Sequence, residues 1–392
     1  MNRRDMMKQC AALTATIPFF SWLTGCDTEG GLYDNFEVNF TGKVLIIGAG
    51  AAGLAAGYIL DRYGIDFQII EASPRIGGRV RAVEDFADFP IDLGAEWIHE
   101  APSVLSDLID DVTVEGAIDV VPYSPDTVYS YSNDRLTRLN AGGNYYSEYK
   151  FKKTTWFSFL QEYIAANITD RIVLSSPVAD IDYSGDTVIV TDINGEQYEG
   201  DRILVTVPTK ILQGESIHFQ PALPDAKLSA INAVEIPPGL KVIFEFSERF
   251  YPDITLVGGS DQIYFDTAFR KDSDRNILSL FYVSPDANRF TDLAGDQEIV
   301  DAVLAELDAI FDGKASATYL NHVVQNWSAE PYIQGAYTYT VQGNEEDVIL
   351  ALQEPVEGLV YFAGESCSLY NTATVPGAMQ SGYAAVEALL KG

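Results

Sequence analysis

The sequence predicts a two-domain α/β fold, and three observations support this prediction. A strand, a glycine-rich turn, a helix and a second strand follow one another between residues 43 and 71. Two later stretches, 171–208 and 359–386, carry strand patterns or a strand followed by a helix, so the chain returns to the first domain after excursions. The 392 residues, 47% of them hydrophobic and 21% charged, are enough for two globular domains.

The pattern that organises the first domain begins at Lys43. The apolar, β-branched run at 44–47 is too short for a helix and indicates a buried strand. Small and helix-forming residues then continue to about Tyr63, and a second apolar run at 67–70 ends at Glu71. The turn between the first strand and the helix carries three glycines in G-x-G-x-x-G spacing, namely Gly48, Gly50 and Gly53.

Each part of this pattern has a mechanical reason in a dinucleotide-binding domain. The first glycine permits a tight turn, the second lets a pyrophosphate approach the backbone, and the third lets the helix pack closely on the strand. The first helical turn, which includes Ala52, offers N–H groups to the phosphates. Glu71 can accept hydrogen bonds from a ribose 2′-OH and would repel the 2′-phosphate of NADP. A purely structural glycine turn is the alternative, but the flanking strands and the acid favour a dinucleotide.

The residues after the second strand carry a resemblance to a known family. Glu71, Arg75, Gly77, Gly78 and Arg79 form E-x-x-x-R-x-G-G-R, which resembles a motif of the FAD-dependent amine oxidase superfamily (monoamine, polyamine and L-amino-acid oxidases). The resemblance implies that this motif, with Ala72 inside it, lies against the FAD diphosphate. Glycines would bring the backbone close, and arginine would neutralise phosphate charge. The alternative is a loop with two surface arginines.

The resemblance covers nearly all of residues 43–392 and implies a Rossmann-like FAD-binding domain with a mixed α+β substrate domain, both discontinuous. Val178 falls where the backbone of the family contacts the adenine. Mixed helical patterning after residue 100 predicts that the first part of the substrate domain is helical. The predicted parts are 43–100, 170–215 and 356–392 for the FAD-binding domain, and 101–169 and 216–355 for the substrate domain.

The composition is strongly acidic, with 57 acidic against 25 basic residues and a formal net charge of −32. A chain with this balance is not expected to bind nucleic acid or anionic lipid by electrostatics. The charge could draw in cationic amines, or it could reflect a surface adapted to a salty habitat. Solubility alone accounts for most of it, so the composition names no substrate.

Residues 1–25 resemble an export signal of the twin-arginine type. Their apolar stretch is shorter than the roughly 20 residues that a membrane span needs. Residues 23–26 resemble a bacterial lipobox, which predicts a lipid on Cys26 and an exported protein, periplasmic or at the cell surface. An ordinary secretory signal with an incidental cysteine is the alternative. Residues 26–42 are predicted to be a linker, and Cys367 is left without a disulfide partner in the mature chain.

Residues 90–99, PIDLGAEWIH, resemble the segment that passes close to the flavin in amine and polyamine oxidases. His99 would line the substrate cavity, and Glu100 replaces the glycine of the family. The arginine that holds the substrate carboxylate in L-amino-acid oxidases is absent, which disfavours an α-amino acid. The alternatives are that Trp97 is a core residue and His99 a satisfied, partly buried histidine. The resemblance implies cofactor contacts from Gly94, Ala95, Glu96 and Trp97.

Residues 239–250 alternate strongly between apolar and polar and predict a strand that contains Lys241. The family has a lysine here, near the flavin N5 and bridged to it by a water. A lysine between apolar residues is costly to bury unless it is solvated or paired, and desolvation would lower its pKa. The alternative is an exposed lysine on an edge strand.

Residues 326–340, NWSAEPYIQGAYTYT, resemble the segment that precedes the last part of the FAD-binding domain. Trp327 would lie near the isoalloxazine, and Tyr337 matches one wall of the aromatic cage that holds an amine against the flavin. Ala336 follows Gly335 where monoamine oxidases carry their flavin-linking cysteine. The resemblance therefore implies FAD bound without a covalent link at this position.

The C-terminal stretch resembles the last FAD-binding segment of the family. Gly364 and Glu365 belong to F-A-G-E, whose glutamate bonds the ribityl–diphosphate region. Thr374 and Val375 match the turn into the last helix, whose N–H groups would stabilise the negative charge of the reduced flavin. Thr374 aligns with the second cage tyrosine of monoamine oxidases, so the cage would be half open.

The resemblance implies FAD-dependent oxidation of a primary amine or a polyamine, by hydride transfer to the flavin N5. Dioxygen would be the acceptor, and the products would be hydrogen peroxide and an imine that hydrolyses. The alternatives are an L-amino-acid oxidase, another flavin oxidoreductase with a different acceptor, and a flavoprotein that only binds. The scattered histidines suggest no metal site. The residues expected to shape the reaction are Lys241, Tyr337, His99, Trp327 and Thr374.

Overall fold

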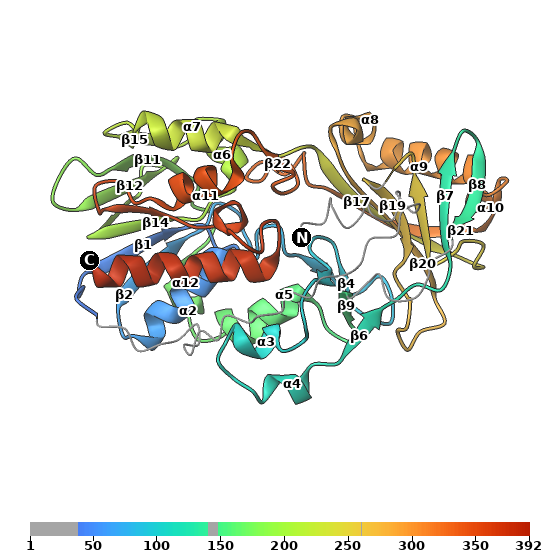
Figure 1. Ribbon diagram of the computed structural model, residues 1–392, viewed down its shortest axis with the longest axis horizontal. Coiled ribbons are helices and arrows are strands. Elements are labelled where there is room, and N and C mark those ends of the chain that lie inside the picture. Colours follow the sequence, from blue (N-terminus) through green and yellow to red (C-terminus); the bar gives the residue numbers. More distant parts are fainter. Residues whose placement is uncertain (1–37, 140–147, 260) are drawn as a thin grey trace, which may run out of the picture.

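The computed structural model describes residues 38–139, 148–259 and 261–392. These residues form two lobes side by side, one around a parallel sheet and the other around a long antiparallel sheet (Figure 1). The predicted signal, Cys26 and most of the predicted linker lie outside the described residues. Among the residues that the structure describes, no helix is both long and apolar enough to cross a membrane.

Five parallel strands form the central sheet of the first lobe, in the order β10–β2–β1–β14–β23. The middle strands are apolar along their length because both faces of the sheet are covered. Stretches of the chain that are far apart in sequence therefore build one sheet, as the sequence predicted. The strands are β1 (Lys43–Ile47), β2 (Asp66–Ile70), β10 (Ile172–Val173), β14 (Arg202–Val205) and β23 (Val360–Phe362).

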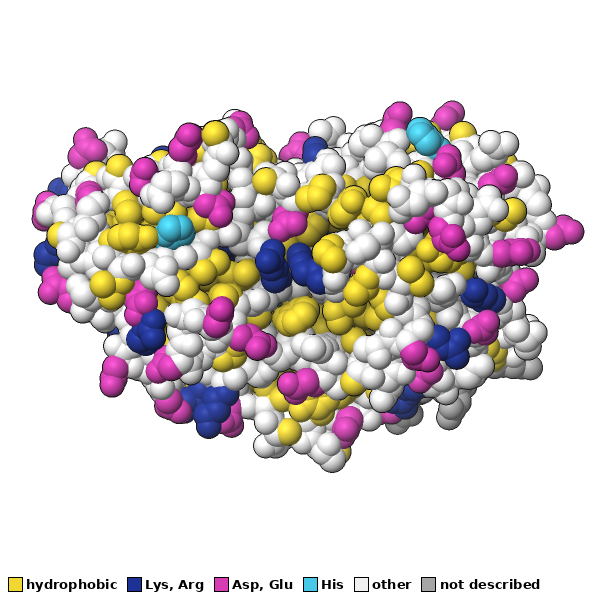
Figure 2. All heavy atoms as spheres, turned by 180° about the vertical axis from the view of Figure 1, so that it is seen from behind, with side chains coloured by type: hydrophobic (Ala, Val, Ile, Leu, Met, Phe, Trp, Pro, Cys, Tyr) yellow, Lys and Arg dark blue, Asp and Glu magenta, His cyan; other side chains and the backbone are white. Residues whose placement is uncertain are grey.

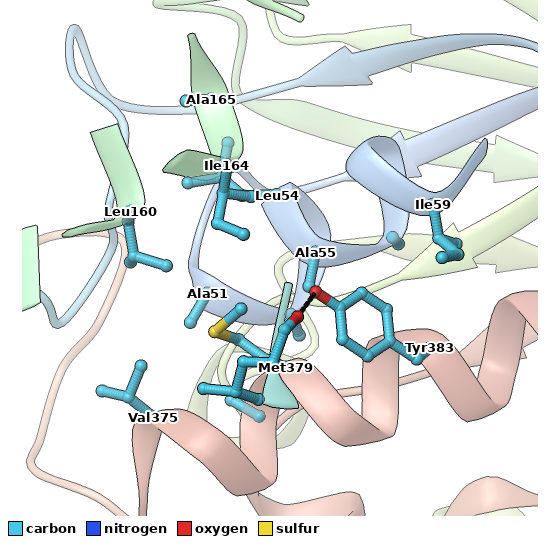
Figure 3. Close-up of a cluster of buried hydrophobic side chains, with 14 of the residues drawn as sticks. Ala51, Leu54, Ala55, Ile59, Leu160, Ile164, Ala165, Val375, Met379 and Tyr383 are labelled. Atoms are coloured by element: carbon cyan, nitrogen blue, oxygen red, sulfur yellow. Dashed lines mark hydrogen bonds between the residues drawn. The ribbon is translucent and has the colours of Figure 1, made fainter. Parts of the chain in front are cut away.

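Helices α2 (Ala51–Arg62) and α12 (Val375–Lys391) cover one face of this sheet and pack against each other (Figure 3). Their approach is close: a Cβ at Gly382 would lie 2.4 Å from the carbonyl oxygen of Ala52. The Tyr383 hydroxyl donates to the carbonyl of Leu108 at 2.7 Å. Close packing thus holds α12 to α2, and the hydrogen bond of Tyr383 holds α12 to the chain at Leu108.

A small second sheet, in the order β13–β12–β11–β15, covers the other face. Two hairpins build it, as the alternation in 171–208 predicted. The strands are β11 (Val178–Asp182), β12 (Val188–Asp192), β13 (Gln197–Gly200) and β15 (His218–Gln220), and the nearby helices are α6 (Thr209–Gln213), α7 (Asp225–Ala233) and α11 (Glu345–Gln353).

The second lobe is built on a seven-stranded sheet, in the order β21–β17–β20–β19–β18–β7–β8. The apolar stripe of α9 (Asp296–Ile310) packs on this sheet, with α8 (Asn288–Thr291) and α10 (Lys314–Thr318) beside it. The strands are β7 (Val128–Ser132), β8 (Arg135–Leu139), β17 (Gly239–Phe246), β18 (Ile254–Val257), β19 (Gln262–Asp266), β20 (Asn276–Val283) and β21 (Tyr319–Asn326).

The predicted helical character of residues 101–169 is wrong for the described part of that range. Four strands lie there, and the helices are single turns apart from the continuous helical stretch at 156–165. Two of the strands join β5 (Trp97–Ile98) in a sheet of order β5–β9–β6, and the other two belong to the large sheet. The elements are α3 (Val104–Asp107), α4 (Val114–Ala117), β6 (Val120–Tyr123), β7, β8, β9 (Glu148–Phe151), α5 (Trp156–Phe159) and the π-helical η1 (Leu160–Ala165).

Further elements of two or three residues complete the fold. In the described part of 101–169, Trp156 and Phe159 are buried in the hydrophobic core around α2 and α12, and Tyr149, Phe157 and Tyr163 pack against it. The remaining elements are β3 (Ala82–Val83), β4 (Ile91–Asp92), η2 (Thr169–Arg171), β16 (Val234–Glu235), η3 (Pro285–Ala287), β22 (Thr340–Val341) and η4 (Glu365–Cys367).

Candidate active site

The glycine-rich turn has open space beside Gly50 but no space for a side chain at Gly53. Gly48 has φ of 107°, a conformation that favours glycine. A Cβ at Gly53 would lie 1.9 Å from the carbonyl oxygen of Gly48, whereas a Cβ at Gly50 would meet nothing within 4 Å. No side chain caps the N-terminus of α2, and its first turn carries no acid. This uncapped end can receive an anion such as a phosphate.

Glu71 fixes the same turn from the end of β2. Its carboxylate accepts hydrogen bonds from the N–H of Ala49 at 2.6 Å and from the N–H and hydroxyl of Ser73 at 2.8 and 2.7 Å. The side chain is buried, and the adjacent Ala72 is half-buried. The structure thus gives Glu71 a role within the protein, and its contact with a ribose stays a prediction.

The loop of the E-x-x-x-R-x-G-G-R motif lies against the glycine turn. The N–H of Gly77 donates to the carbonyl of Ala49 at 2.8 Å, and a Cβ at Gly78 would come within 3.3 Å of the Cα of Gly50. Arg75 donates to the carbonyl of Gly78 at 3.1 Å and therefore folds onto its own loop. The two glycine motifs form one continuous surface.

Arg79 and Glu365 join the N-terminal and C-terminal motifs. The guanidinium donates to the carboxylate at 2.9 Å and to the carbonyl of Ala336 at 3.0 Å. The buried carboxylate also accepts from the N–H groups of Thr338 at 3.2 Å and Ala373 at 3.1 Å. A cavity lies beside this pair and is lined in part by Arg79, Gly364, Glu365, Ser366 and Cys367.

The turn at residues 92–96 is held by Lys241. This lysine is 1% exposed and lies on β17, which is an inner strand, so the alternative of an exposed edge lysine is wrong. Its ammonium donates to the carbonyls of Asp92 at 2.7 Å and Gly94 at 3.1 Å and to Glu96 Oε2 at 2.7 Å. Three acceptors match the three ammonium protons, so Lys241 binds the turn itself. Its predicted role in holding a water beside the flavin stays a prediction.

Glu96 pairs with a second buried cation that the sequence analysis missed. The Nζ of Lys150, on β9, lies 2.5 Å from Glu96 Oε1 and stands over the rings of Tyr123 and Phe265 at 5.0 and 4.8 Å. Burial alone would raise the pKa of Glu96, but Lys150 and Lys241 outweigh it and lower that pKa to about 2. The sequence signal that could have indicated it is a lysine that lies between the aromatic residues Tyr149 and Phe151 of β9.

Three aromatic residues predicted at the site lie around the same turn. Trp97 packs in a core cluster with Phe265, at 4.8 Å between ring centroids, which agrees with its alternative as a core residue. Trp327 is buried, and its indole N–H donates to the carbonyl of Leu93 at 3.1 Å. Tyr337 stacks on Phe281 with 11° between the ring planes. A Cβ at Gly94 would lie 1.8 Å from the carbonyl oxygen of Arg79, and Ala95 packs against the hydrophobic core around α2 and α12.

His99 is paired and partly exposed. Its Nδ1 lies 2.6 Å from Glu148 Oε1, and the buried carboxylate belongs to β9. The neighbouring Glu100 has a pKa raised above its ordinary value, chiefly by burial. One ring nitrogen of the histidine thus has a hydrogen-bond partner, and the side chain is 30% exposed. The place of His99 in the wall of the substrate cavity stays a prediction.

Thr374 caps α12. Its hydroxyl accepts from the N–H of Gly377 at 3.0 Å and donates to the carbonyl of Asn371 at 2.8 Å, and Val375 begins the helix. Cys367 is buried, which raises the pKa of its thiol to about 12, so it is an inert thiol at neutral pH. Val178 starts β11 and is buried.

The residues of the first lobe fit a dinucleotide. The open side of Gly50, the uncapped helix and the cavity beside Arg79 provide space, N–H groups and a positive charge for a diphosphate. Figure 2 shows dark blue basic side chains together with apolar ones where the lobes meet, whereas acidic side chains are spread over the outer surface. Among the described residues, no cluster of histidine, cysteine and acidic side chains could hold a metal ion.

The comparisons with known proteins identify the family of this chain. The family described as flavin containing amine oxidoreductase matches residues 51–146 and 157–390, and the chain belongs to this family. The predicted superfamily and fold class, and FAD as the cofactor, are confirmed.

Curated relatives include lysine-specific histone demethylase 2 of Homo sapiens, which is 26% identical over 87% of this chain and 52% of the relative. The chain thus spans about half the length of this relative. Polyamine oxidase 3 of Oryza sativa subsp. japonica is 22% identical over 88% of this chain and 89% of the relative.

Solved structures show the same fold. Cyclohexylamine oxidase from Brevibacterium oxydans IH-35A superposes with a TM-score of 0.75 and 19% identity, over 90% of this chain and 99% of that protein. Putrescine oxidase bound to putrescine gives a TM-score of 0.73 with 16% identity, over 88% and 98% of the two chains.

Proposed function

We propose that this protein oxidises a primary amine or a polyamine and uses dioxygen as the electron acceptor. FAD accepts a hydride from the carbon that bears the amino group, dioxygen takes up the electrons to give hydrogen peroxide, and water hydrolyses the imine product. The observation that carries the proposal is the turn at 92–96, which Lys241 and Trp327 hold from two sides. Several relatives and structural neighbours are named as oxidases of polyamines, putrescine or cyclohexylamine, which supports an amine as the substrate.

The surroundings of Glu96 disfavour an L-amino-acid oxidase. An α-amino acid needs a cation for its carboxylate, and arginine is the residue suited to that contact. This chain has Trp97 at the position of that arginine, and the carboxylate of the preceding Glu96 is already bound by Lys150 and Lys241. Both lysines are buried, and their ammonium groups lie 2.5 and 2.7 Å from the carboxylate oxygens of Glu96.

We also propose that FAD is bound without a covalent link, because Ala336 has no group that could form one. Acid precipitation of the purified protein should release all of its flavin into the supernatant. Flavin that stays with the precipitate would contradict this.

We further propose that the protein is exported and anchored by a lipid on Cys26. The support is the sequence resemblance alone. A Cys26→Ala variant should move from the membrane fraction to the soluble fraction after cell lysis, and an unchanged distribution would contradict the anchor.

A peroxide-release screen of the purified protein, with its FAD content measured, tests the proposed reaction. The panel pairs amines and polyamines with the amino acids from which they derive by decarboxylation. Peroxide with an amine, and its loss in Lys241→Met, is the expected result. Faster turnover of the amino acids would favour the L-amino-acid oxidase, and FAD reduced by an amine without peroxide would indicate another acceptor.

A further inference from the structure

Two lysines share one carboxylate in the interior of the protein. Glu96 Oε1 lies 2.5 Å from the Nζ of Lys150, and Glu96 Oε2 lies 2.7 Å from the Nζ of Lys241. All three side chains are at least 96% buried. The three residues come from β9, β17 and the turn at 92–96, and Figure 1 places β4 and β9 between the two lobes. We call this group the lysine–glutamate triad.

The triad carries one positive charge in excess. Two ammonium groups face one carboxylate. Two further buried acidic groups lie near the cluster: Asp92, whose carboxyl accepts from the N–H of Trp156 at 3.2 Å, and Asp266, which pairs with Arg249 at 2.9 Å. Burial and the nearby Glu96 raise the pKa of Asp92 well above its ordinary value, which favours its neutral form. Lys271 lies at the edge of the cluster with its Nζ over Phe89 at 4.6 Å, and burial lowers its pKa to about 8.

Stability does not explain this arrangement. Burial removes three charges from water, and a buried ion pair is often matched or exceeded in stability by apolar residues of the same volume. The second lysine adds a charge that Glu96 alone does not neutralise. The rings of Trp97, Tyr123 and Phe265, at 5.6, 5.0 and 4.8 Å from the Nζ of Lys150, supply the remaining stabilisation through their faces.

The triad is attached to the part of the chain that we assign to the cofactor. Lys241 donates to the carbonyl of Gly94, and a Cβ at Gly94 would touch both the backbone of Arg79 and the indole of Trp327. A charge in this dry region acts with little screening, because the effective dielectric constant there is far below that of water. Reduction of a flavin adds negative charge to it, so an adjacent positive charge favours the reduced form.

We propose that Lys150 and Glu96 are positioning residues that set the reduction potential of the bound flavin through the excess positive charge of the triad. This inference rests on the proposed function, since it requires FAD at the assigned site. It assigns a role to two residues that lie behind Lys241 and do not touch the substrate. If the triad served folding alone, every substitution in it would destabilise the protein. The reduction potential of the flavin would then not depend on the sign of the charge that is removed.

The test is the midpoint reduction potential of the purified, full-length, FAD-loaded protein in charge variants. Lys150→Met removes a positive charge, and we expect the ratio of reduced to oxidised flavin at a fixed potential to fall at least fivefold. Glu96→Gln removes a negative charge and should raise that ratio. The double variant E96Q/K150M removes one charge of each sign and should return to within about twofold of the wild type.

Lys152→Met is the matched control, because Lys152 lies two residues further along and pairs with the exposed Asp272 at 2.9 Å. Solvent screens this surface pair, so its loss should change the ratio less than twofold. Shifts of Lys150→Met and Glu96→Gln in the same direction, or no shift in either, would overturn the inference. If Glu96→Gln does not fold, the double variant alone decides. A ratio of reduced to oxidised flavin in E96Q/K150M that equals that of Lys150→Met, and not that of the wild type, would overturn the inference. A wild-type protein that binds no FAD would overturn the proposed function as well.

Discussion

Asp92 is a buried carboxyl group whose charge the fold disfavours. Its pKa is raised well above the ordinary 3.8, chiefly by burial and then by Glu96. Between the ordinary and the raised pKa, the folded protein binds more protons than the unfolded chain, so stability falls as pH rises through this window. Above the raised pKa, the full cost of a buried charge is present.

Asp92→Asn should therefore stabilise the protein at pH 7, by about 1–2 kcal/mol, because the amide keeps an acceptor for the N–H of Trp156 without the charge. The gain should shrink as the pH falls below the ordinary pKa of 3.8, where the wild-type carboxyl becomes protonated in both states. Thermal unfolding of both proteins across this range measures the effect. A difference that does not depend on pH would contradict the argument.

The burial of Lys241 was one of two alternatives that the sequence left open, and its partners could not be predicted. The alternation in 239–250 placed the lysine between apolar residues, which indicates a paired cation. Lys150 lies on a strand within the stretch that the sequence analysis predicted as helical, so its contact with Glu96 could not be foreseen. A contact between residues far apart in the chain depends on the register of β5 with β9, where Trp97 pairs with Lys150.

At the scale of elements, two glycines of the glycine-rich turn serve different purposes: Gly53 is required for folding, and Gly50 is expected to be required for FAD binding. Gly50 has an extended backbone, and its Cβ position faces open space, so Gly50→Ala should fold with little loss of stability. The added methyl group would occupy the side that a pyrophosphate needs, and the FAD affinity should fall at least tenfold. Titration of the apoprotein with FAD, together with thermal unfolding, measures both.

Gly53→Ala is the matched control for this prediction. A Cβ there would lie 1.9 Å from the carbonyl oxygen of Gly48, so the variant should lose about 3 kcal/mol or more even without cofactor. Equal losses of stability in Gly50→Ala and Gly53→Ala would show that both glycines serve the fold alone.

The N-terminal cap of α12 also allows an effect on stability to be distinguished from an effect on FAD binding. Thr374 and Asn344 each accept a backbone N–H at the start of a helix, α12 and α11 respectively. Either residue replaced by alanine should cost about 1 kcal/mol of stability. Only Thr374→Ala should also weaken FAD binding, because α12 begins at the predicted flavin edge. Equal FAD affinity in both variants would place the cofactor away from this helix end.

The strands β6 to β9 were missed for a physical reason. They have four or five residues each, and β8 alternates with mostly exposed side chains, so the hydrophobic signal is weak. The turn between β7 and β8 carried a usable signal, since Asn133 and Asp134 both have positive φ, as a type I′ hairpin requires. Longer elements with a strong pattern, such as β1, α2 and β17, were predicted within a residue or a few of their bounds.

At the scale of the whole molecule, the net charge of −32 should destabilise the folded state through self-repulsion. Salt screens such repulsion over about 10 Å at 0.1 M. The unfolding temperature should therefore rise as sodium chloride is increased from low to moderate concentration, with the same effect from potassium chloride. An unchanged or falling unfolding temperature would show that the repulsion is balanced by local ion pairs.

The overall architecture could be predicted because the family motifs lie on strands and turns of the central sheet. The motifs at 43–79 and 359–377 meet in the structure through Arg79 and Glu365, as one discontinuous domain requires. The bounds of the domains assigned from the sequence stay predictions. The shape of the substrate cavity could not be derived, since it depends on side chains from several loops and strands in both lobes.

Anaerobic addition of amines to the FAD-loaded protein tests the central claim most directly. We predict that at least one primary amine or polyamine bleaches the visible absorption of the flavin, while the matching amino acid does not, and that Lys241→Met slows this bleaching. A flavin that stays oxidised with every amine, yet is reduced by dithionite, would contradict the assignment of this protein as an amine oxidase.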